Sequence, residues 1–151
     1  MNGLKRVLLA EDNSKDVELT LSALSQHHLA NEVVVARDGA EAWDYLKRQG
    51  TFADRAEGNP AVVLLDLKMP KMDGLEVLRR LRADAGLRAI PVVMLTSSNE
   101  ERDVVESYKL GVNAYVVKPV AFEDFITAVK NVGLFWAVLN QPPPGSIRRV
   151  A

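Results

Sequence analysis

The sequence predicts an α/β fold in which a doubly wound sheet of five parallel strands carries helices on both faces. Five short, continuously apolar runs rich in β-branched residues predict strands that are buried on both faces. Longer amphipathic segments separate these runs, and parallel strands need such crossovers between them. The alternation of strand and helix therefore favours a parallel sheet, and 151 residues are enough for one domain with a sizeable core.

Apolar runs indicate the strands, and apolar residues at helical spacing indicate the helices. The strands are expected at residues 7–10, 33–35, 62–65, 91–95 and 114–117. In chain order, the helices are indicated by Val17, Leu21 and Leu24; by Ala42, Trp43 and Leu46; by Gly74, Leu78 and Leu81; by Val104 and Tyr108; and by Phe122, Phe125, Ile126, Val129 and Val132.

Residues with known preferences for helix ends support these boundaries. Asn13 or Ser14 is expected to cap the first helix, Asp38-Gly39 to open the second, and Gly111 to follow the fourth. The mixed charges around the end of the third helix predict a solvated face; they belong to Arg79, Arg80, Arg82 and Asp84.

Two segments are expected to lie outside regular structure. Residues 49–60 predict an exposed loop before the third strand, longer than such connections usually are. Residues 140–151 include three consecutive prolines, which end a helix and favour a flexible, partly polyproline II tail. The expected domain therefore spans residues 1–139, with an extended final helix, and the tail spans residues 140–151.

Composition excludes several classes of site. The chain has no cysteine, which excludes disulfides, thiolate catalysis and Cys-ligated metal centres. His27 and His28 are adjacent near a helix end and point in different directions, so we expect them to be solvated. A net charge of -1 provides no basic surface for nucleic acid. No apolar run is long enough for a signal peptide or a membrane span, so we expect a cytoplasmic protein.

Polar residues follow four of the predicted strands, at the ends where open α/β sheets bind their ligands. Glu11 and Asp12 follow the first strand, and Asp66 follows the third. Thr96 follows the fourth strand, and Lys118 follows the fifth. Three carboxylates, a hydroxyl and an ammonium are therefore expected around one pocket.

Crowded carboxylates favour a divalent cation with hard oxygen ligands, because such a cation holds them ionised. Mg²⁺ is the expected cofactor and Mn²⁺ the alternative, since Mg²⁺ combines one or two carboxylates with water and a phosphoryl oxygen. The Asp66 carboxylate could then attack phosphorus in line and become an aspartyl phosphate. Lys118 and the Thr96 hydroxyl would stabilise the remaining phosphoryl oxygens.

Four segments, each at a predicted strand end, resemble the receiver domain of two-component response regulators. They are Leu9-Ala10-Glu11-Asp12-Asn13, LLDLKMPKMDG at residues 64–74, Leu95-Thr96-Ser97-Ser98, and YVVKP at residues 115–119. Their presence in the right order is more specific than any one of them. The resemblance extends from about Lys5 to Leu139. It implies a flavodoxin-like (βα)5 fold with strand order 2-1-3-4-5.

The resemblance assigns roles to the residues around the expected pocket. It implies Asp66 as phosphoacceptor and metal ligand, Asp12 as a direct metal ligand, and Glu11 as a ligand through water. It also implies the Lys68 backbone carbonyl as a metal ligand and Lys118 as the partner of the phosphoryl group.

The resemblance further implies a switch. The Thr96 hydroxyl would move to the phosphoryl group while the Tyr115 ring turns inward, changing the surface of the fourth helix, fifth strand and fifth helix. The Lys118-Pro119 peptide bond would be cis. Such a protein accepts a phosphoryl group from a histidine kinase or a phosphotransfer protein, and is not an enzyme acting on a separate substrate.

The output is expected to be a contact made by the receiver itself, because residues 140–151 are too few for another domain. The final helix continues through an apolar segment, in which Phe135, Trp136 and Leu139 are expected to contact a second copy of the chain. Alternatively, this segment folds back onto the sheet of its own chain and makes no contact with a second copy. The long loop and the Phe-Trp pair resemble small regulators that work with phytochrome-type sensor histidine kinases.

Other interpretations account for fewer of these residues. Asp66, Asp73 and Gly74 also suit a simple polar turn with a helix cap. A haloacid dehalogenase-type phosphatase uses an Asp nucleophile with Mg²⁺, but it needs a second Asp where this chain has Lys68. A nucleotide-binding module would place its phosphate loop after the first strand. There Glu11 and Asp12 repel phosphate unless a metal ion intervenes, and no glycine-rich fingerprint occurs.

Overall fold

The computed structural model describes residues 6–26, 32–97 and 101–117. Strands and helices alternate along the described chain, as predicted. In order they are β1 (Arg6–Ala10), α1 (Ser14–Gln26), β2 (Glu32–Ala36), α2 (Gly39–Lys47), the short 3-10 helix η1 (Gly50–Phe52), β3 (Val62–Leu65), α3 (Gly74–Ala83), β4 (Val92–Thr96), α4 (Glu101–Lys109) and β5 (Ala114–Val117).

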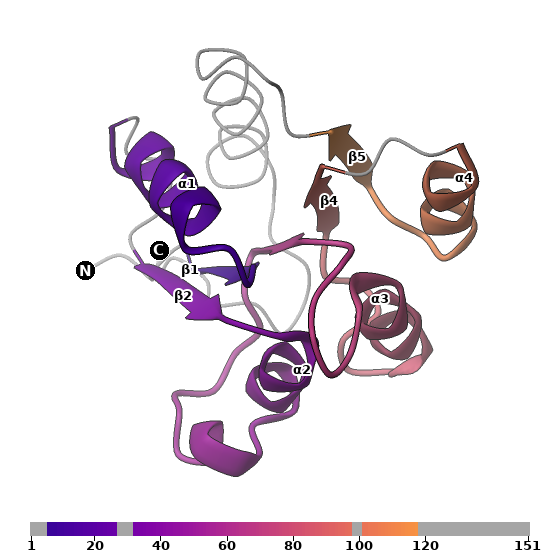
Figure 1. Cartoon of the computed structure of the whole chain (residues 1–151). Coiled ribbons are helices and arrows are strands. Elements are labelled where there is room, and N and C mark those ends of the chain that lie inside the picture. The colour runs from indigo at the N-terminus through magenta and orange to yellow at the C-terminus, as the bar shows by residue number, and fades with distance from the viewer. Residues whose placement is uncertain (1–5, 27–31, 98–100, 118–151) are drawn as a thin grey trace, which may run out of the picture.

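The described strands form one parallel sheet in the order β2-β1-β3-β4-β5 (Figure 1). The central strands pair in register, with Val7 of β1 opposite both Val33 of β2 and Val62 of β3. The predicted α/β class with a parallel sheet is therefore confirmed. The final helix and the tail of the prediction lie outside the described residues.

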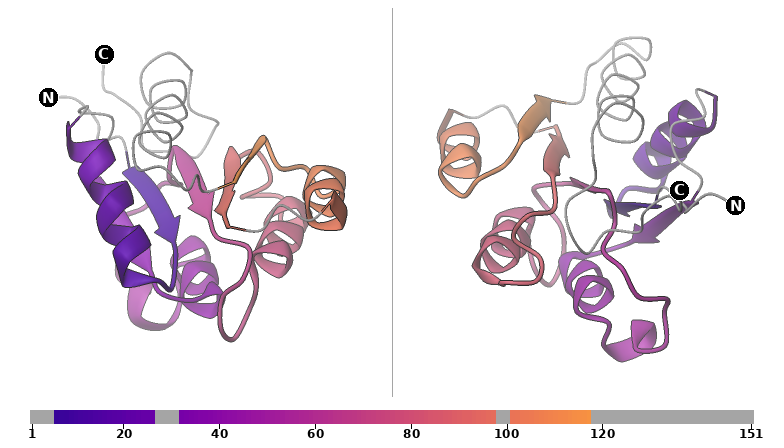
Figure 2. Two further views of the ribbon diagram at one scale, coloured as in Figure 1. Left: turned by 45° about the horizontal axis from the view of Figure 1, so that its top comes forward. Right: turned by 180° about the vertical axis from the view of Figure 1, so that it is seen from behind.

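The two faces of the sheet bury separate cores, because successive side chains of a strand point to opposite faces. Leu8 packs on the face that carries α2 and α3, together with Leu46 and Leu78. Its neighbour Leu9 packs on the opposite face with Val17 of α1. Figures 1 and 2 show α1 separated by the sheet from α2 and α3. Helices thus cover both faces, as a doubly wound sheet requires.

Side chains and a glycine define the helix ends that the sequence indicates. Asn13, and not Ser14, caps α1, since its Oδ1 accepts two backbone N–H groups of the first turn at 3.0 and 3.1 Å. Asp38 caps α2 by accepting from the Glu41 N–H at 2.7 Å. Gly111 follows α4 with φ 92°, a left-handed conformation that suits glycine.

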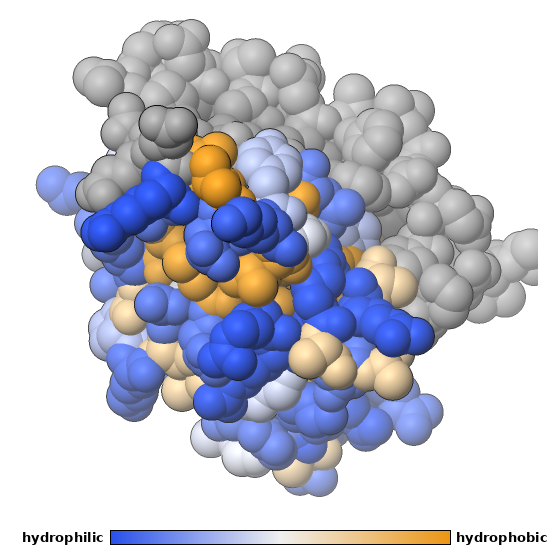
Figure 3. Space-filling model, turned by 90° about the vertical axis from the view of Figure 1, so that its right-hand side faces the viewer, coloured by the Kyte–Doolittle hydropathy of each residue, from blue (hydrophilic) through white to orange (hydrophobic). Residues whose placement is uncertain are grey.

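Helix α4 lies where it is predicted, but it presents a different side to the sheet. Spacing predicts Val104 and Tyr108 on one apolar face, whereas Tyr108 is 51% exposed and Ser107 is fully buried. Val105 is 45% exposed. Figure 3, which faces the right-hand side of Figure 1 where α3 and α4 lie, shows a small apolar area among hydrophilic side chains. The helix that Val104 and Tyr108 indicate is therefore present, with Tyr108 on its exposed side.

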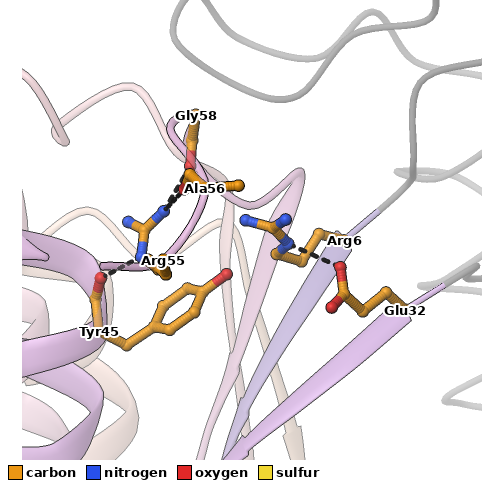
Figure 4. A network of polar contacts seen from close by, with 6 residues as sticks. All are labelled: Arg6, Glu32, Tyr45, Arg55, Ala56 and Gly58. Carbon is orange, nitrogen blue, oxygen red and sulfur yellow. Dashed lines mark hydrogen bonds and ion pairs between the residues drawn. The ribbon is translucent and has the colours of Figure 1, made fainter. Parts of the chain in front are cut away.

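The segment before β3 is more ordered than the exposed loop predicted for residues 49–60. It contains η1, and Arg55 is half-buried over the Tyr45 ring, 4.2 Å from the ring centroid. The Arg55 guanidinium donates to the carbonyls of Tyr45, Ala56 and Gly58 at 2.7–3.0 Å (Figure 4). One cation thereby closes the loop and attaches it to the end of α2.

Arg82 also departs from its prediction as part of a solvated face. Its half-buried guanidinium donates to the carbonyls of Arg88, Ile90 and Gly111 and to the side chain of Asn113, at 2.7–2.9 Å. Burial lowers the pKa of Arg82. The side chain ties the connection before β4 to the connection before β5.

No helix in the described ranges has the length and apolar character needed to cross a membrane.

The start of β1 carries a third guanidinium that is shielded from solvent, that of Arg6. Arg6 donates through Nε to Glu32 at 2.9 Å, while its Nη1 is buried without a hydrogen-bond partner (Figure 4). The buried hydroxyl of Tyr45 likewise makes no hydrogen bond of good geometry, although it interacts with the nearby Arg6 guanidinium. Burial raises the pKa of Tyr45, although the nearby charges of Arg6 and Arg55 lower it in part.

We expect Tyr45→Phe to change stability near neutral pH by less than about 1 kcal/mol, because the buried hydroxyl has no hydrogen bond of good geometry to lose. The pKa of Tyr45 is raised by folding, so the native protein should lose stability as pH rises above about 10. The variant should lose less. Urea unfolding of both proteins at neutral and alkaline pH measures this, and identical pH dependence would contradict it.

Candidate functional site

Asp66 stands at the carboxyl end of the central strand β3. Its backbone N–H donates to the Ala10 carbonyl at 2.9 Å, which continues the ladder between β1 and β3 by one residue. Its side chain is 7% exposed, and Oδ1 accepts the N–H of Leu67 at 2.8 Å. The sheet therefore fixes both the backbone and the carboxylate of this residue.

Glu11 and Asp12 leave the neighbouring strand β1 at the same edge. The Glu11 backbone continues the sheet by donating to the Ala36 carbonyl at 2.9 Å, and its side chain is 2% exposed. Its Oε2 accepts the N–H of Asn13 at 3.1 Å. Asp12 is exposed. One carboxylate oxygen from each of Glu11, Asp12 and Asp66 lies within 4.8 Å of the others, so the structure brings these predicted residues together.

The donor set fits a hard divalent cation. Two unit charges about 5 Å apart repel each other by about 3 kcal/mol at an effective dielectric constant of about 20. Glu11 and Asp66 are buried at such a separation, and Asp12 adds a third carboxylate from the solvent side. Carboxylate oxygens are the ligands that Mg²⁺ and Mn²⁺ take in proteins. The three carboxylates therefore provide the type of ligand that such an ion needs.

Helix α3 packs directly against the backbone of Asp66. A Cβ placed on Gly74, the first residue of α3, would lie only 2.2 Å from the Asp66 carbonyl oxygen. The Gly74 N–H donates to the Leu67 carbonyl at 2.7 Å and closes the loop between β3 and α3 at its base. Asp73 caps α3 by accepting the Glu76 N–H at 2.9 Å. A polar turn with a helix cap, the alternative interpretation of Asp66, Asp73 and Gly74, is therefore present. The carboxylate cluster that includes Asp66 is present as well.

The loop between β3 and α3 contains a tight turn. The Met72 N–H donates to the Pro70 carbonyl at 2.7 Å, and the central residue Lys71 has φ 69°. This is a γ-turn with positive φ, which is rare and strained for a residue with a side chain. Lys68 lies in the same loop, and its side chain is exposed.

The remaining predicted site residues are described only in part or not at all. Thr96 ends β4 and pairs with Val117 of β5, and Tyr115 pairs with Met94; for Thr96 and Tyr115 only the backbone is described. The other predicted residues lie outside the described residues: Lys118, Pro119, Phe135, Trp136 and Leu139.

The glycines that pack against the backbone of Asp66 and of the loop that follows it were not identified as such from the sequence. The motif at residues 64–74 places Gly74 beside Asp66 but does not indicate how closely their backbones approach. Gly39 is expected only as the start of a helix, whereas in the structure it packs on the backbone of Met72. The glycine at the first position of two successive helices is the signal that could have suggested these contacts.

Comparison with known proteins gives one family. The model of the response regulator receiver domain matches residues 7–130. Response regulator Rcp1 of Synechocystis sp. strain PCC 6803 is 38% identical over 135 residues, covering 89% of this chain and 90% of that protein.

Solved structures agree with this match. The phosphorylated cyanobacterial phytochrome response regulator RcpA has a TM-score of 0.86 and 40% identity, covering 92% of this chain and 98% of the other. The Mn²⁺-bound form of Rcp1 has a TM-score of 0.85 and 37% identity, covering 92% and 99%. The bacteriophytochrome response regulator RtBRR has a TM-score of 0.76 and 65% identity, covering 95% and 86%.

We expect Gly74→Ala to lower the free energy of unfolding by about 2–3 kcal/mol, since its Cβ would force α3 away from the backbone of Asp66. Urea unfolding measures the loss. Gly86→Ala is the matched control, because a Cβ there would meet only the Asp84 carboxylate, at an ordinary 3.4 Å. Equal losses in the two variants would contradict the close packing described for Gly74.

Proposed function

This chain belongs to the family of response regulator receiver domains of two-component signalling, and from that premise we propose that Asp66 is its phosphoacceptor. The cluster of Glu11, Asp12 and Asp66 carries the proposal, because it lies within the segment that the family model matches. Asp66 is the member on the central strand, with its carboxylate oriented by the Leu67 N–H.

The proposed reaction transfers one phosphoryl group. A carboxylate oxygen of Asp66 attacks the phosphorus of a phosphohistidine, the phosphorus–nitrogen bond breaks as a phosphorus–oxygen bond forms, and an acyl phosphate results. A bound divalent cation would neutralise charge on the phosphoryl oxygens. Glu11, Asp12, Asp66 and the Lys68 carbonyl would hold this cation, and Lys118 and Thr96 would contact the phosphoryl oxygens. The chain would act as a phosphoacceptor, not as an enzyme on a separate substrate.

The relatives support the proposed cofactor and partner. A Mn²⁺-bound form of Rcp1 is known, and we propose Mg²⁺ as the ion that this chain uses. RcpA and RtBRR are described as regulators of phytochrome systems, so we propose a phytochrome-type sensor histidine kinase as the partner. A cytoplasmic location is part of the same proposal.

We propose that the complete domain spans residues 1–139, a five-stranded (βα)5 fold with an extended final helix, followed by the tail at residues 140–151. Phosphorylation would shift Thr96 and Tyr115 and alter the surface of α4, β5 and the final helix. The exposure of Val105 and Tyr108 on α4 supports an output there, because exposed apolar and aromatic side chains favour protein contacts.

Intact mass after incubation with acetyl phosphate and Mg²⁺ tests the phosphoacceptor. The native protein should gain one phosphoryl group, and Asp66→Asn should abolish the gain. Asp73→Asn is the matched control, since Asn caps a helix as well as Asp does and the residue lies outside the cluster. Removal of Mg²⁺ with EDTA should also prevent the gain.

Two results would contradict the proposal. One is a phosphoryl gain that Asp66→Asn retains; the other is steady release of inorganic phosphate from many phosphomonoesters, which would favour the haloacid dehalogenase-type phosphatase. No comparison supports that alternative.

We also propose a homodimer through Phe135, Trp136 and Leu139. Sedimentation velocity of the native protein should give a dimer, and simultaneous replacement of these residues by Ala should shift it to a monomer. A native monomer at high concentration, with and without a phosphoryl mimic such as beryllofluoride, would overturn the dimer.

A further inference from the structure

The start of α2 packs against the loop that follows the proposed phosphoacceptor. Gly39 is the first residue of α2 and is buried. A Cβ built on it would lie 1.7 Å from the carbonyl oxygen of Met72, 2.6 Å from the carbonyl carbon and 2.9 Å from the Met72 Cβ. Real Cβ atoms do not approach other atoms nearer than 3.0 Å, so any side chain at position 39 would push this backbone away.

A second contact joins the same two segments. Asp38 caps α2 with Oδ1, and its Oδ2 lies 3.6 Å from the Nζ of Lys71. Lys71 is the central residue of the γ-turn, directly before Met72. The exposed ion pair itself contributes little. It shows, however, that the turn and the α2 amino terminus meet through adjacent residues on both sides.

The loop held in this way is short and is anchored at both ends. The Gly74 N–H closes its base on the Leu67 carbonyl at 2.7 Å, so residues 67–73 form one loop that is closed at its base. Lys68, whose carbonyl is the proposed backbone metal ligand, lies inside that segment. Gly39 contacts this loop at Met72, four residues after Lys68.

We infer that Gly39 is a positioning residue for the divalent-cation site: its lack of a side chain lets the 67–73 loop seat on α2 and thereby places the Lys68 carbonyl. The inference rests on the proposed function. Mg²⁺ binds well only with near-ideal octahedral geometry. A Cβ at position 39 would start 1.7 Å from the Met72 carbonyl oxygen, so the loop would have to move by more than 1 Å before the two atoms were 3.0 Å apart. A site that requires near-ideal geometry is sensitive to such a displacement.

Equilibrium Mn²⁺ binding, followed by the loss of the electron paramagnetic resonance signal of the free ion, tests the inference. Gly39→Ala should bind Mn²⁺ about 10-fold more weakly than the native protein or worse, the range found when groups that orient metal ligands are removed. Gly86→Ala, whose Cβ meets no backbone, should bind Mn²⁺ like the native protein. Circular dichroism of each variant in EDTA, and so without bound metal, identifies conditions in which the variant is folded before Mn²⁺ is added.

Hydrogen exchange of the native protein provides a second measurement, which does not depend on whether the variant folds. Coupling between two sites is reciprocal, so saturating Mg²⁺ should slow amide exchange at residues 39–42 together with residues 67–73. The turn at residues 86–88 should exchange at the same rate with and without Mg²⁺.

The outcomes separate the inference from the function on which it rests. Failure of the native protein to bind Mn²⁺ would overturn the proposed cation site itself. Native binding with equal affinity in folded Gly39→Ala would overturn only the role of Gly39. If the variant does not fold, unchanged exchange at residues 39–42 on Mg²⁺ binding would overturn it instead.

Discussion

Mutual repulsion among three carboxylates is the constraint around which this structure is built. An isolated chain would separate Glu11, Asp12 and Asp66, yet the fold holds an oxygen of each within 4.8 Å of the others. It does so because Glu11 and Asp66 each extend a ladder of backbone hydrogen bonds by one residue beyond the end of a central strand. Two cores, one on each face, keep those strands in place. The stability of the whole sheet thus offsets a local electrostatic cost.

The carboxylate cluster and three of the arginines lie at opposite ends of the sheet. The carboxylates gather where the strands end, whereas Arg6, Arg55 and Arg82 lie near the connections that lead into the strands. There the guanidinium groups of Arg55 and Arg82 donate to backbone carbonyls of irregular segments, including those of Gly58 and Ile90. The arginines at one end of the sheet thus hold the connecting segments together, whereas the carboxylates at the other end form the proposed cation site.

Much of this organisation could be predicted from the sequence, because it depends on local patterns. Apolar runs located the strands, Asp38 and Gly111 located helix ends, and the motif around Asp66 located the carboxylate cluster. Contacts between distant segments were not predictable in this way. The charged neighbours of Arg82 in the sequence predict that it is solvated. Nothing in the local sequence shows that carbonyls 6 to 29 residues away converge on its guanidinium. The exposure of Tyr108 was not predictable for the same reason, because α4 is oriented by its packing on β5 and α3 and not by its own composition.

The contacts of Arg55 with the loop before β3 make that loop suitable for engineering. Its guanidinium binds backbone carbonyls, which every residue type offers, and no side chain of the loop is needed as an acceptor. The exposed positions between η1 and β3 therefore carry few sequence requirements and lie at the end of the sheet opposite the carboxylates. A peptide tag or a fluorescent label could be grafted there, provided that Arg55 is kept, with little effect on the site.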